Sequence, residues 1–171
     1  MTYSPIASAL NKLSETIRSN PEKAHAKYAS ATARLENGLK CRVTGPSGEQ
    51  IETDMPAAMG GKGEGPNPGW FFRASLAACC STVIAAQAAR LGINLTKLEV
   101  TVEGEGDVRG MLGLDNTVSA GHSAIRSNVQ IGATNATPEQ LQKLVEWAVD
   151  HSPVCRTVRD APMNTVRVIT I

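Results

Sequence analysis

The feature that most constrains this chain is an uncharged stretch of 16 residues between Arg73 and Arg90. Seven of the twenty residues from Phe71 to Arg90 are alanine, and apolar side chains would lie on every side of a helix formed there. A helix that is apolar all round is enclosed by protein, and this run is shorter than the roughly 20 residues that a membrane-spanning helix needs. We therefore predict a buried core helix over about Pro68 to Leu91 and no membrane association.

The other elements predict strands in runs rather than in strict alternation with helices. An amphipathic helix is expected over Pro5 to Asn20, and Thr137 and Gln140 form the capping box of a later helix. Strands are expected over 28–35, 39–44, 50–54, 95–106, 123–133 and 165–170, a short glycine-broken piece over 110–114, and a type I′ hairpin at Asn37-Gly38. This order favours an α+β fold with antiparallel sheets around the long buried central helix.

The length of 171 residues suits a single domain over 1–171, with residues 1–26 as an N-terminal helical arm. Residues 1–20 carry Lys12, Glu15 and Arg18 and lack a continuous apolar segment, so they do not resemble a secretory signal. The expected location is therefore the cytoplasm. The net charge of +1 argues against general binding to nucleic acid or to an anionic membrane surface.

The four cysteines form no Cys-x-x-Cys pair, so no structural metal site is expected. The glycine-rich segment Gly60 to Gly69 lacks the spacing of a phosphate-binding loop, because Gly63 follows Lys62 where such a loop has Ser or Thr. We therefore expect neither a cofactor nor a metal. Any of the cysteines can also be read as a small buried hydrophobic residue.

Cys155 has the strongest local argument for reactivity. Ser152 can cap a helix that begins at Pro153, which places Cys155 in the first turn, where backbone N–H groups and the helix dipole favour a thiolate. A buried structural cysteine is the alternative for this residue. His151 lies four residues before Cys155, but Pro153 breaks the helical register between them, so a solvated surface histidine is the more economical interpretation. Cys79 and Cys80 lie in mid-helix without help from a dipole, and local signals alone favour core packing for both.

From about Thr32 to Ile171 the chain resembles the OsmC/Ohr family, through the order and spacing of several short motifs. The motifs are Gly60-Gly61, Gly65-Pro66-Asn67-Pro68, Leu76-Ala77-Ala78-Cys79, Leu91-Gly92-Ile93, Leu98 to Gly104, Asp107 to Gly110, Ser152-Pro153-Val154 and Arg156-Thr157-Val158. The resemblance implies an intertwined homodimer in which two long helices pack between β-sheets and two sites lie at the subunit interface.

Active members of this family are thiol peroxidases that reduce organic hydroperoxides. By resemblance, Cys79 is the cysteine that attacks the peroxide, a second cysteine then closes a disulfide, and a dithiol reductant restores both. An Arg and a Glu hold the attacking thiolate. The implied catalytic residues are Cys79 and Cys155, with Cys80 as another candidate for the resolving thiol.

This chain departs from the family pattern at three points. Ser152 stands where the resolving cysteine would precede Pro153, and Cys155 appears three residues later. Gly69 stands where the glutamate is expected, and the activating arginine aligns with neither Arg34 nor Arg42. These departures leave alternatives open: a non-peroxidatic protein that binds a small apolar ligand, or a redox or stress-response protein that forms a disulfide without efficient turnover.

Overall fold

A computed structural model describes residues 5–170 of the chain, which form two compact units. Residues 9–75 make up one unit, and residues 76–170 with residues 5–8 make up the other. Residues 1–4 of the expected arm and residue 171 at the end of the expected domain lie outside the described residues. The single domain over 1–171 stays a prediction.

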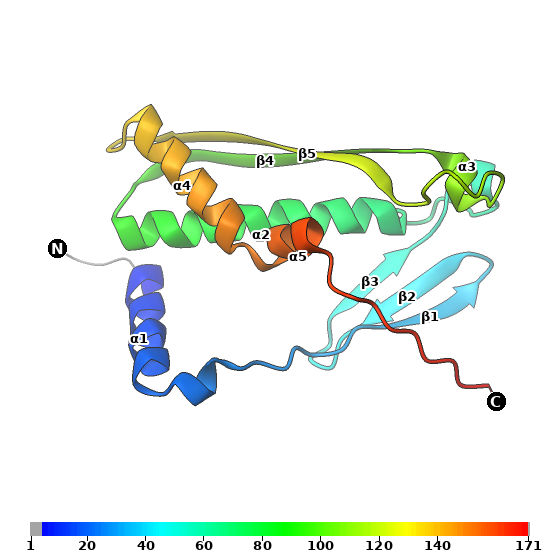
Figure 1. Cartoon of the computed structure of the whole chain (residues 1–171), viewed down its shortest axis with the longest axis horizontal. Helices are drawn as coiled ribbons and strands as arrows, with labels where there is room; N and C mark the ends of the chain where they lie inside the picture. Colours follow the sequence, from blue (N-terminus) through cyan, green and yellow to red (C-terminus); the bar gives the residue numbers. More distant parts are fainter. Residues whose placement is uncertain (1–4, 171) are drawn as a thin grey trace. The chain divides into compact units, whose positions relative to one another are not determined.

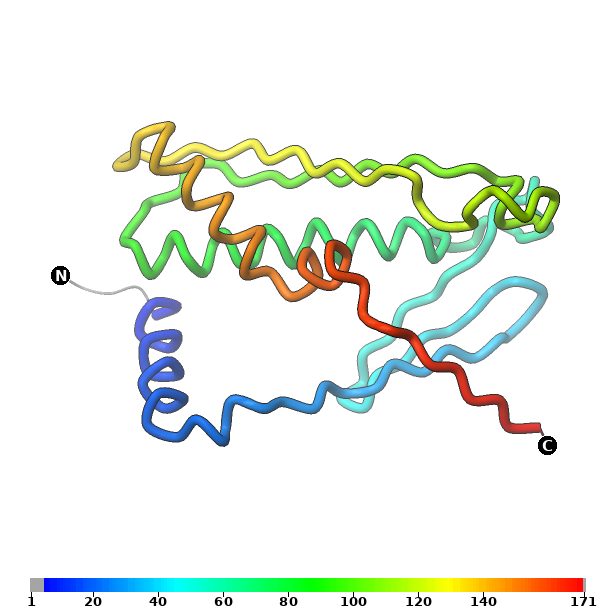
Figure 2. Tube along the Cα trace, viewed as in Figure 1, coloured from blue at the N-terminus to red at the C-terminus, as the bar shows by residue number. Residues whose placement is uncertain are grey.

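The unit that contains residues 76–170 is built on a long antiparallel ribbon. β4 (Leu95–Gly106) pairs with β5 (His122–Ala133), from Leu95 opposite Ala133 to Gly106 opposite His122. The ribbon runs alongside the long helix α2 (Pro68–Leu91), as Figures 1 and 2 show. The short glycine-broken piece expected over 110–114 overlaps the end of α3 (Val108–Met111), which Asp107 caps by accepting a hydrogen bond from the Arg109 N–H.

The core of this unit lies between α2, the ribbon and α4 (Pro138–His151). Its buried members come from the two helices: Cys80, Ile84, Ala88, Leu141, Leu144 and Ala148. Side chains of β4 and β5, including Leu98, Val100 and Ile131, pack against them. The α+β class, the antiparallel pairing and the bounds of the central helix are confirmed.

Within one chain α2 is buried along a single stripe. Its buried residues recur every four positions, at Leu76, Cys80, Ile84 and Ala88, so they share one helix face. The other faces of the helix, predicted to be enclosed as well, are only partly covered by the chain itself. By length and composition α2 is the one described helix that could cross a membrane, a test that core helices also pass.

α4 and α5 (Pro153–Asp160) follow one another with Ser152 between them. The predicted capping box starts α4, because the Thr137 hydroxyl accepts from the Gln140 N–H while the Gln140 side chain accepts from the Thr137 N–H. Ser152 ends α4 and caps α5, and Pro153 sits at the first helical position, where its missing N–H costs nothing. Cys155 therefore lies in the first turn of α5, as the sequence predicts.

The other unit holds a three-stranded antiparallel sheet in the order β1-β2-β3. β1 (Thr32–Asn37), β2 (Lys40–Thr44) and β3 (Gln50–Thr53) match the predicted strands apart from their ends. The predicted type I′ turn at Asn37-Gly38 is wrong. Asn37 pairs with Lys40 and only Gly38 adopts a positive φ, of 58°, so the two-residue loop is Gly38-Leu39.

The remaining elements are short or peripheral. α1 (Pro5–Ser19) confirms the predicted amphipathic helix, and 3₁₀ turns follow at η1 (Pro21–Ala24) and η2 (Ala57–Met59). The strand predicted over 165–170 is wrong: residues 161–170 are described, but none of them belongs to a strand or helix. Val166, Val168 and Ile169 are at least 74% exposed, because a β-rich sequence forms a strand only where a second strand pairs with it.

Candidate active site

The cysteine on α2 that the family resemblance selects faces the junction of α4 and α5. The Ser152 hydroxyl donates a hydrogen bond to the Cys79 sulfur, with 3.1 Å between Oγ and Sγ. Cys79 is half-buried, whereas Ser152 is completely buried. The break between the two helices thus places a buried hydroxyl group against the sulfur of a half-buried cysteine.

Ser152 is also bound to the helix that it caps. The Cys155 N–H donates to the Ser152 Oγ, with 3.3 Å between nitrogen and oxygen. The hydroxyl therefore accepts from the first turn of α5 and donates to Cys79. Sequence reasoning identified Ser152 only as a cap and as a departure from the family pattern, and its contact with Cys79 was missed because the two residues are 73 positions apart.

The remaining two thiols of the site contact each other. The side chains of Cys80 and Cys155 are neighbours, and Cys155 packs against the core that contains Cys80. Burial, followed by the neighbouring thiols Cys155 and Cys79, raises the pKa of Cys80 to about 11. Cys80 is therefore a neutral thiol at physiological pH, and a thiol is a poor nucleophile. Cys79 and Cys155 are both half-buried and lie at the edge of the cluster.

The structure thus brings together Cys79, Cys80 and Cys155, the three cysteines named from the sequence. The fourth, Cys41, lies on β2 in the other unit.

His151 is exposed and held by α4: its Nδ1 hydrogen-bonds the Trp147 carbonyl at 2.7 Å, and its ring stacks on the Trp147 ring at 4.0 Å. Among residues 5–170 no group of three or more His, Cys, Asp or Glu side chains is arranged to bind a metal.

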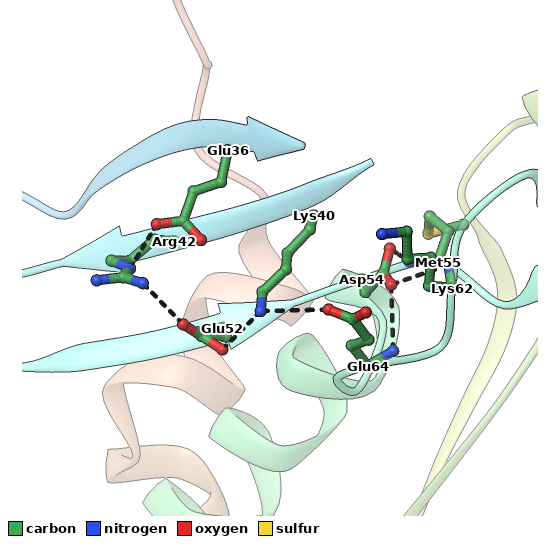
Figure 3. A network of polar contacts seen from close by, with 8 residues as sticks. All are labelled: Glu36, Lys40, Arg42, Glu52, Asp54, Met55, Lys62 and Glu64. Atoms are coloured by element: carbon green, nitrogen blue, oxygen red, sulfur yellow. Dashed lines mark hydrogen bonds and ion pairs between the residues drawn. The ribbon is translucent and has the colours of Figure 1, made fainter. Parts of the chain in front are cut away.

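Arg42, one of the two arginines considered for activating the thiolate, belongs to an ion-pair network on the three-stranded sheet (Figure 3). Its guanidinium contacts Glu36 at 2.7 Å and Glu52 at 3.1 Å. Lys40 binds the same Glu52 at 3.1 Å and Glu64 at 3.4 Å. The hydrogen bond and charge of Lys40 lower the pKa of Glu52, and Glu52 in turn raises the pKa of Lys40. Two carboxylates thus compensate the charge of Arg42 within its own unit.

The other arginine considered, Arg34, lies directly opposite Arg42 in the register of β1 and β2. Residue 34 is exposed, and Arg42 is too. Two like charges opposite each other on a sheet repel, and the carboxylates on either side of Arg42 offset that repulsion.

A buried aspartate shapes the glycine-rich loop that carries part of the family motif. Asp54 is 2% exposed, and its carboxylate accepts hydrogen bonds from the N–H groups of Met55, Lys62 and Glu64 at 2.8–3.1 Å. These backbone hydrogen bonds lower its pKa. A Cβ atom at Gly61 would lie 1.9 Å from the Met55 carbonyl oxygen, so only glycine fits there. Two backbone N–H groups of this loop, those of Lys62 and Glu64, therefore bind Asp54.

A separate cavity of about 410 Å³ lies between the C-terminal end of α2 and α4. Its lining residues are Gln87, Leu91, Gly92, Ile93, Asn135, Gln140, Lys143, Leu144 and Trp147. The Gln87 Oε1 is buried and has no hydrogen-bond partner among the described residues. None of the three clustered cysteines lines this cavity, so it is distinct from the thiol site.

Solved structures with the same fold include OsmC-like proteins and organic hydroperoxide resistance proteins. An OsmC-like protein from Mycoplasma pneumoniae is 19% identical with a TM-score of 0.66, covering 79% of this chain and 89% of that one. The organic hydroperoxide resistance protein OsmC from Legionella pneumophila is 22% identical with a TM-score of 0.57, covering 79% and 92%. OhrB, the organic hydroperoxide resistance protein of Bacillus subtilis, is 24% identical with a TM-score of 0.52, covering 78% and 91%. At these identities the likeness shows the fold.

No curated protein matches the chain in sequence. The model of the OsmC-like protein family matches residues 61–166, which include α2, the β4–β5 ribbon, α4 and α5. The match therefore contains the whole thiol cluster and the serine that joins Cys79 to α5, and this chain belongs to the OsmC-like protein family.

Proposed function

We propose that the protein is a thiol-dependent peroxidase that reduces organic hydroperoxides through Cys79. The observation that carries the proposal is the position of the Cys79 sulfur: half-buried, hydrogen-bonded to the Ser152 hydroxyl, and next to the Cys80–Cys155 pair. The thiolate is the nucleophilic form of a cysteine, and the Ser152 hydroxyl is placed to donate a hydrogen bond to it. Two of the proteins that share the fold are named organic hydroperoxide resistance proteins, which supports the choice of substrate.

In the proposed reaction the Cys79 thiolate attacks the terminal oxygen of the hydroperoxide. The S–O bond forms as the O–O bond breaks, the alcohol leaves after taking up a proton, and Cys79 becomes a sulfenic acid. The Cys155 thiol then attacks the Cys79 sulfur, a Cys79–Cys155 disulfide forms and water leaves. A dithiol reductant returns both cysteines to thiols and is itself oxidised to a disulfide. No cofactor takes part.

Cys155 is the better resolving thiol on physical grounds. It lies half-buried in the first turn of a capped helix, whereas Cys80 is buried and burial keeps it protonated. Cys80 also follows Cys79 directly on α2, and successive helical side chains are turned by about 100° from each other. Attack by Cys80 on the Cys79 sulfenic acid is the second route.

We further propose that the working form is a cytoplasmic homodimer. Only 17% of the most apolar 18-residue window of α2 is buried within one chain, although its mean hydropathy is 1.3. Apolar surface of this extent is normally covered in a soluble protein. A second copy of the chain is the partner that the family resemblance implies, and it would cover this surface.

The test is a count of free thiols after one equivalent of cumene hydroperoxide. Wild-type protein should lose two thiols rapidly and regain them with a dithiol. Cys79→Ser should lose none rapidly, because a hydroxyl is a far weaker nucleophile than a thiolate at neutral pH. Cys41→Ser is the matched control, because Cys41 lies on β2 outside the cluster, and it should behave as wild type. Rapid thiol loss that survives Cys79→Ser would refute the assignment.

The cavity beside α4 favours a second candidate function, the binding of a small, mainly apolar ligand. The unpartnered Gln87 Oε1 would accept a hydrogen bond from such a ligand, and Leu91, Ile93 and Leu144 would contact its apolar part. Trp147 lines the cavity, so an apolar ligand should change the protein's fluorescence, and Gln87→Leu should weaken that response.

A redox-sensing role, with the same disulfide but slow turnover, would appear in the thiol assay as oxidation without multiple turnovers.

A further inference from the structure

Ser152 is a buried polar residue whose hydroxyl joins two elements of the candidate site. Its side chain is fully buried, so its hydroxyl must find partners within the protein. A serine hydroxyl has one proton to donate and can accept through its oxygen. Here the proton is directed to the Cys79 sulfur, and the oxygen accepts from the Cys155 N–H. Capping α5 requires only the second of these bonds.

The two bonds reinforce each other. The N–H groups in the first turn of a helix carry the positive end of its dipole, and Pro153 contributes none, so the Cys155 N–H is among the first available in α5. A hydroxyl that accepts from such a group is polarised and becomes a stronger donor at its own proton. Because Ser152 is out of contact with water, solvent does not screen this effect at the serine.

We propose that Ser152 is a positioning residue for Cys79. Its hydroxyl, polarised by the N–H groups at the start of α5, donates a hydrogen bond to the Cys79 sulfur and stabilises negative charge there. The inference deepens the proposed function, in which Cys79 is the attacking thiol. The same donor would stabilise Cys79 as the leaving thiolate when a reductant opens its disulfide. Ser152 would thus hold the reactive sulfur of Cys79 in place. Because a hydroxyl cannot form a disulfide, another cysteine must react with the Cys79 sulfenic acid.

The test measures how fast iodoacetamide alkylates Cys79 at pH 7, with each cysteine followed separately by peptide mass spectrometry. Ser152→Ala removes the donor and should slow alkylation of Cys79 by about tenfold, the effect of losing one hydrogen bond to a charged group. Ser152→Thr keeps a hydroxyl and should stay near the wild-type rate. Ser152→Gly removes the hydroxyl but remains a tolerated N-cap, so it should be as slow as Ser152→Ala.

Two controls separate this role from a merely structural one. Thr137→Ala removes the cap of α4 and touches none of the cysteines, so it should leave the alkylation rate of Cys79 unchanged. Cys80 is 1% exposed and should stay protected in every variant that keeps its core. If Ser152→Ala exposes Cys80, the alkylation rates of Cys79 in Ser152→Gly and Ser152→Thr are compared instead, because these two variants differ in whether a hydroxyl is present.

Equal alkylation rates of Cys79 in wild type, Ser152→Ala and Ser152→Gly would overturn the inference. The readout does not depend on peroxide, so it fails separately from the proposed function. A slow Ser152→Gly protein whose wild type reduces no hydroperoxide would refute the peroxidase and support the positioning role. An active wild type in which Ser152→Gly reacts normally would do the reverse.

Discussion

Raising the pH from 8 to 11 should destabilise the folded protein through Cys80. This thiol is 1% exposed, and its burial, together with the neighbouring Cys155 and Cys79, raises its pKa from 9.0 to about 11. The folded state therefore holds the Cys80 proton more tightly than the unfolded state does. The resulting stabilisation is fully present below pH 9 and is lost as the pH rises from 9 to about 11. At about 1.4 kcal/mol for each unit of pKa, the loss approaches about 3 kcal/mol well above pH 11 and is about 2 kcal/mol at pH 11, where half of the folded protein still holds the proton.

The assay compares the free energy of unfolding in urea for wild type and Cys80→Ala at pH 8, 9.5 and 11, with a phosphine reductant present. Lysines and tyrosines titrate equally in both proteins, so the difference between them isolates Cys80. Cys80→Ala leaves a small cavity whose cost does not depend on pH. Wild type should be the more stable protein at pH 8, and its advantage should shrink by about 2 kcal/mol by pH 11.

Two further variants sharpen this test. Cys155→Ser removes a neighbouring thiol that raises the pKa of Cys80, so the loss of stability should still begin near pH 9 but end at a lower pH and be smaller. Cys41→Ala deletes the same side chain on β2, outside the thiol cluster, and should show no such loss of advantage. A difference between wild type and Cys80→Ala that is constant from pH 8 to 11 would refute the reasoning.

Three other outcomes are expected. Cys155→Ser should still lose one thiol to cumene hydroperoxide but accumulate Cys79 as sulfenic or sulfinic acid, and a Cys79–Cys80 disulfide found by peptide mapping of this variant would contradict this. Sedimentation at micromolar concentration should find a dimer, and a stable folded monomer would count against the proposed assembly. Thr137→Ala should lower the free energy of unfolding by about 1 kcal/mol, because the capping box of α4 is lost, and an unchanged urea midpoint would argue that the cap is dispensable.

The thiol site was only half predictable from the sequence. The family motif selected Cys79, and the Ser152-Pro153 break placed Cys155 in the first turn of a helix, because caps and prolines act on their immediate neighbours. The hydrogen bond from Ser152 to Cys79 and the pairing of Cys80 with Cys155 join residues more than 70 positions apart. Nothing in the local sequence encodes contacts of that kind, since they depend on how α2 packs against the junction of α4 and α5.

The fold shows the same division. The bounds of α2 and the start of α4 follow from an uninterrupted run of helix-compatible residues and from a capping box, and both are confirmed. The turn at Gly38 and the segment 165–170 were predicted wrongly, because strand formation depends on the register and presence of a partner strand. Local composition thus determined the long helices and where they begin. Only the tertiary structure decided which strands pair, which face of α2 is buried, and which hydroxyl meets the reactive sulfur, because each of these is set by contacts between segments far apart in the chain.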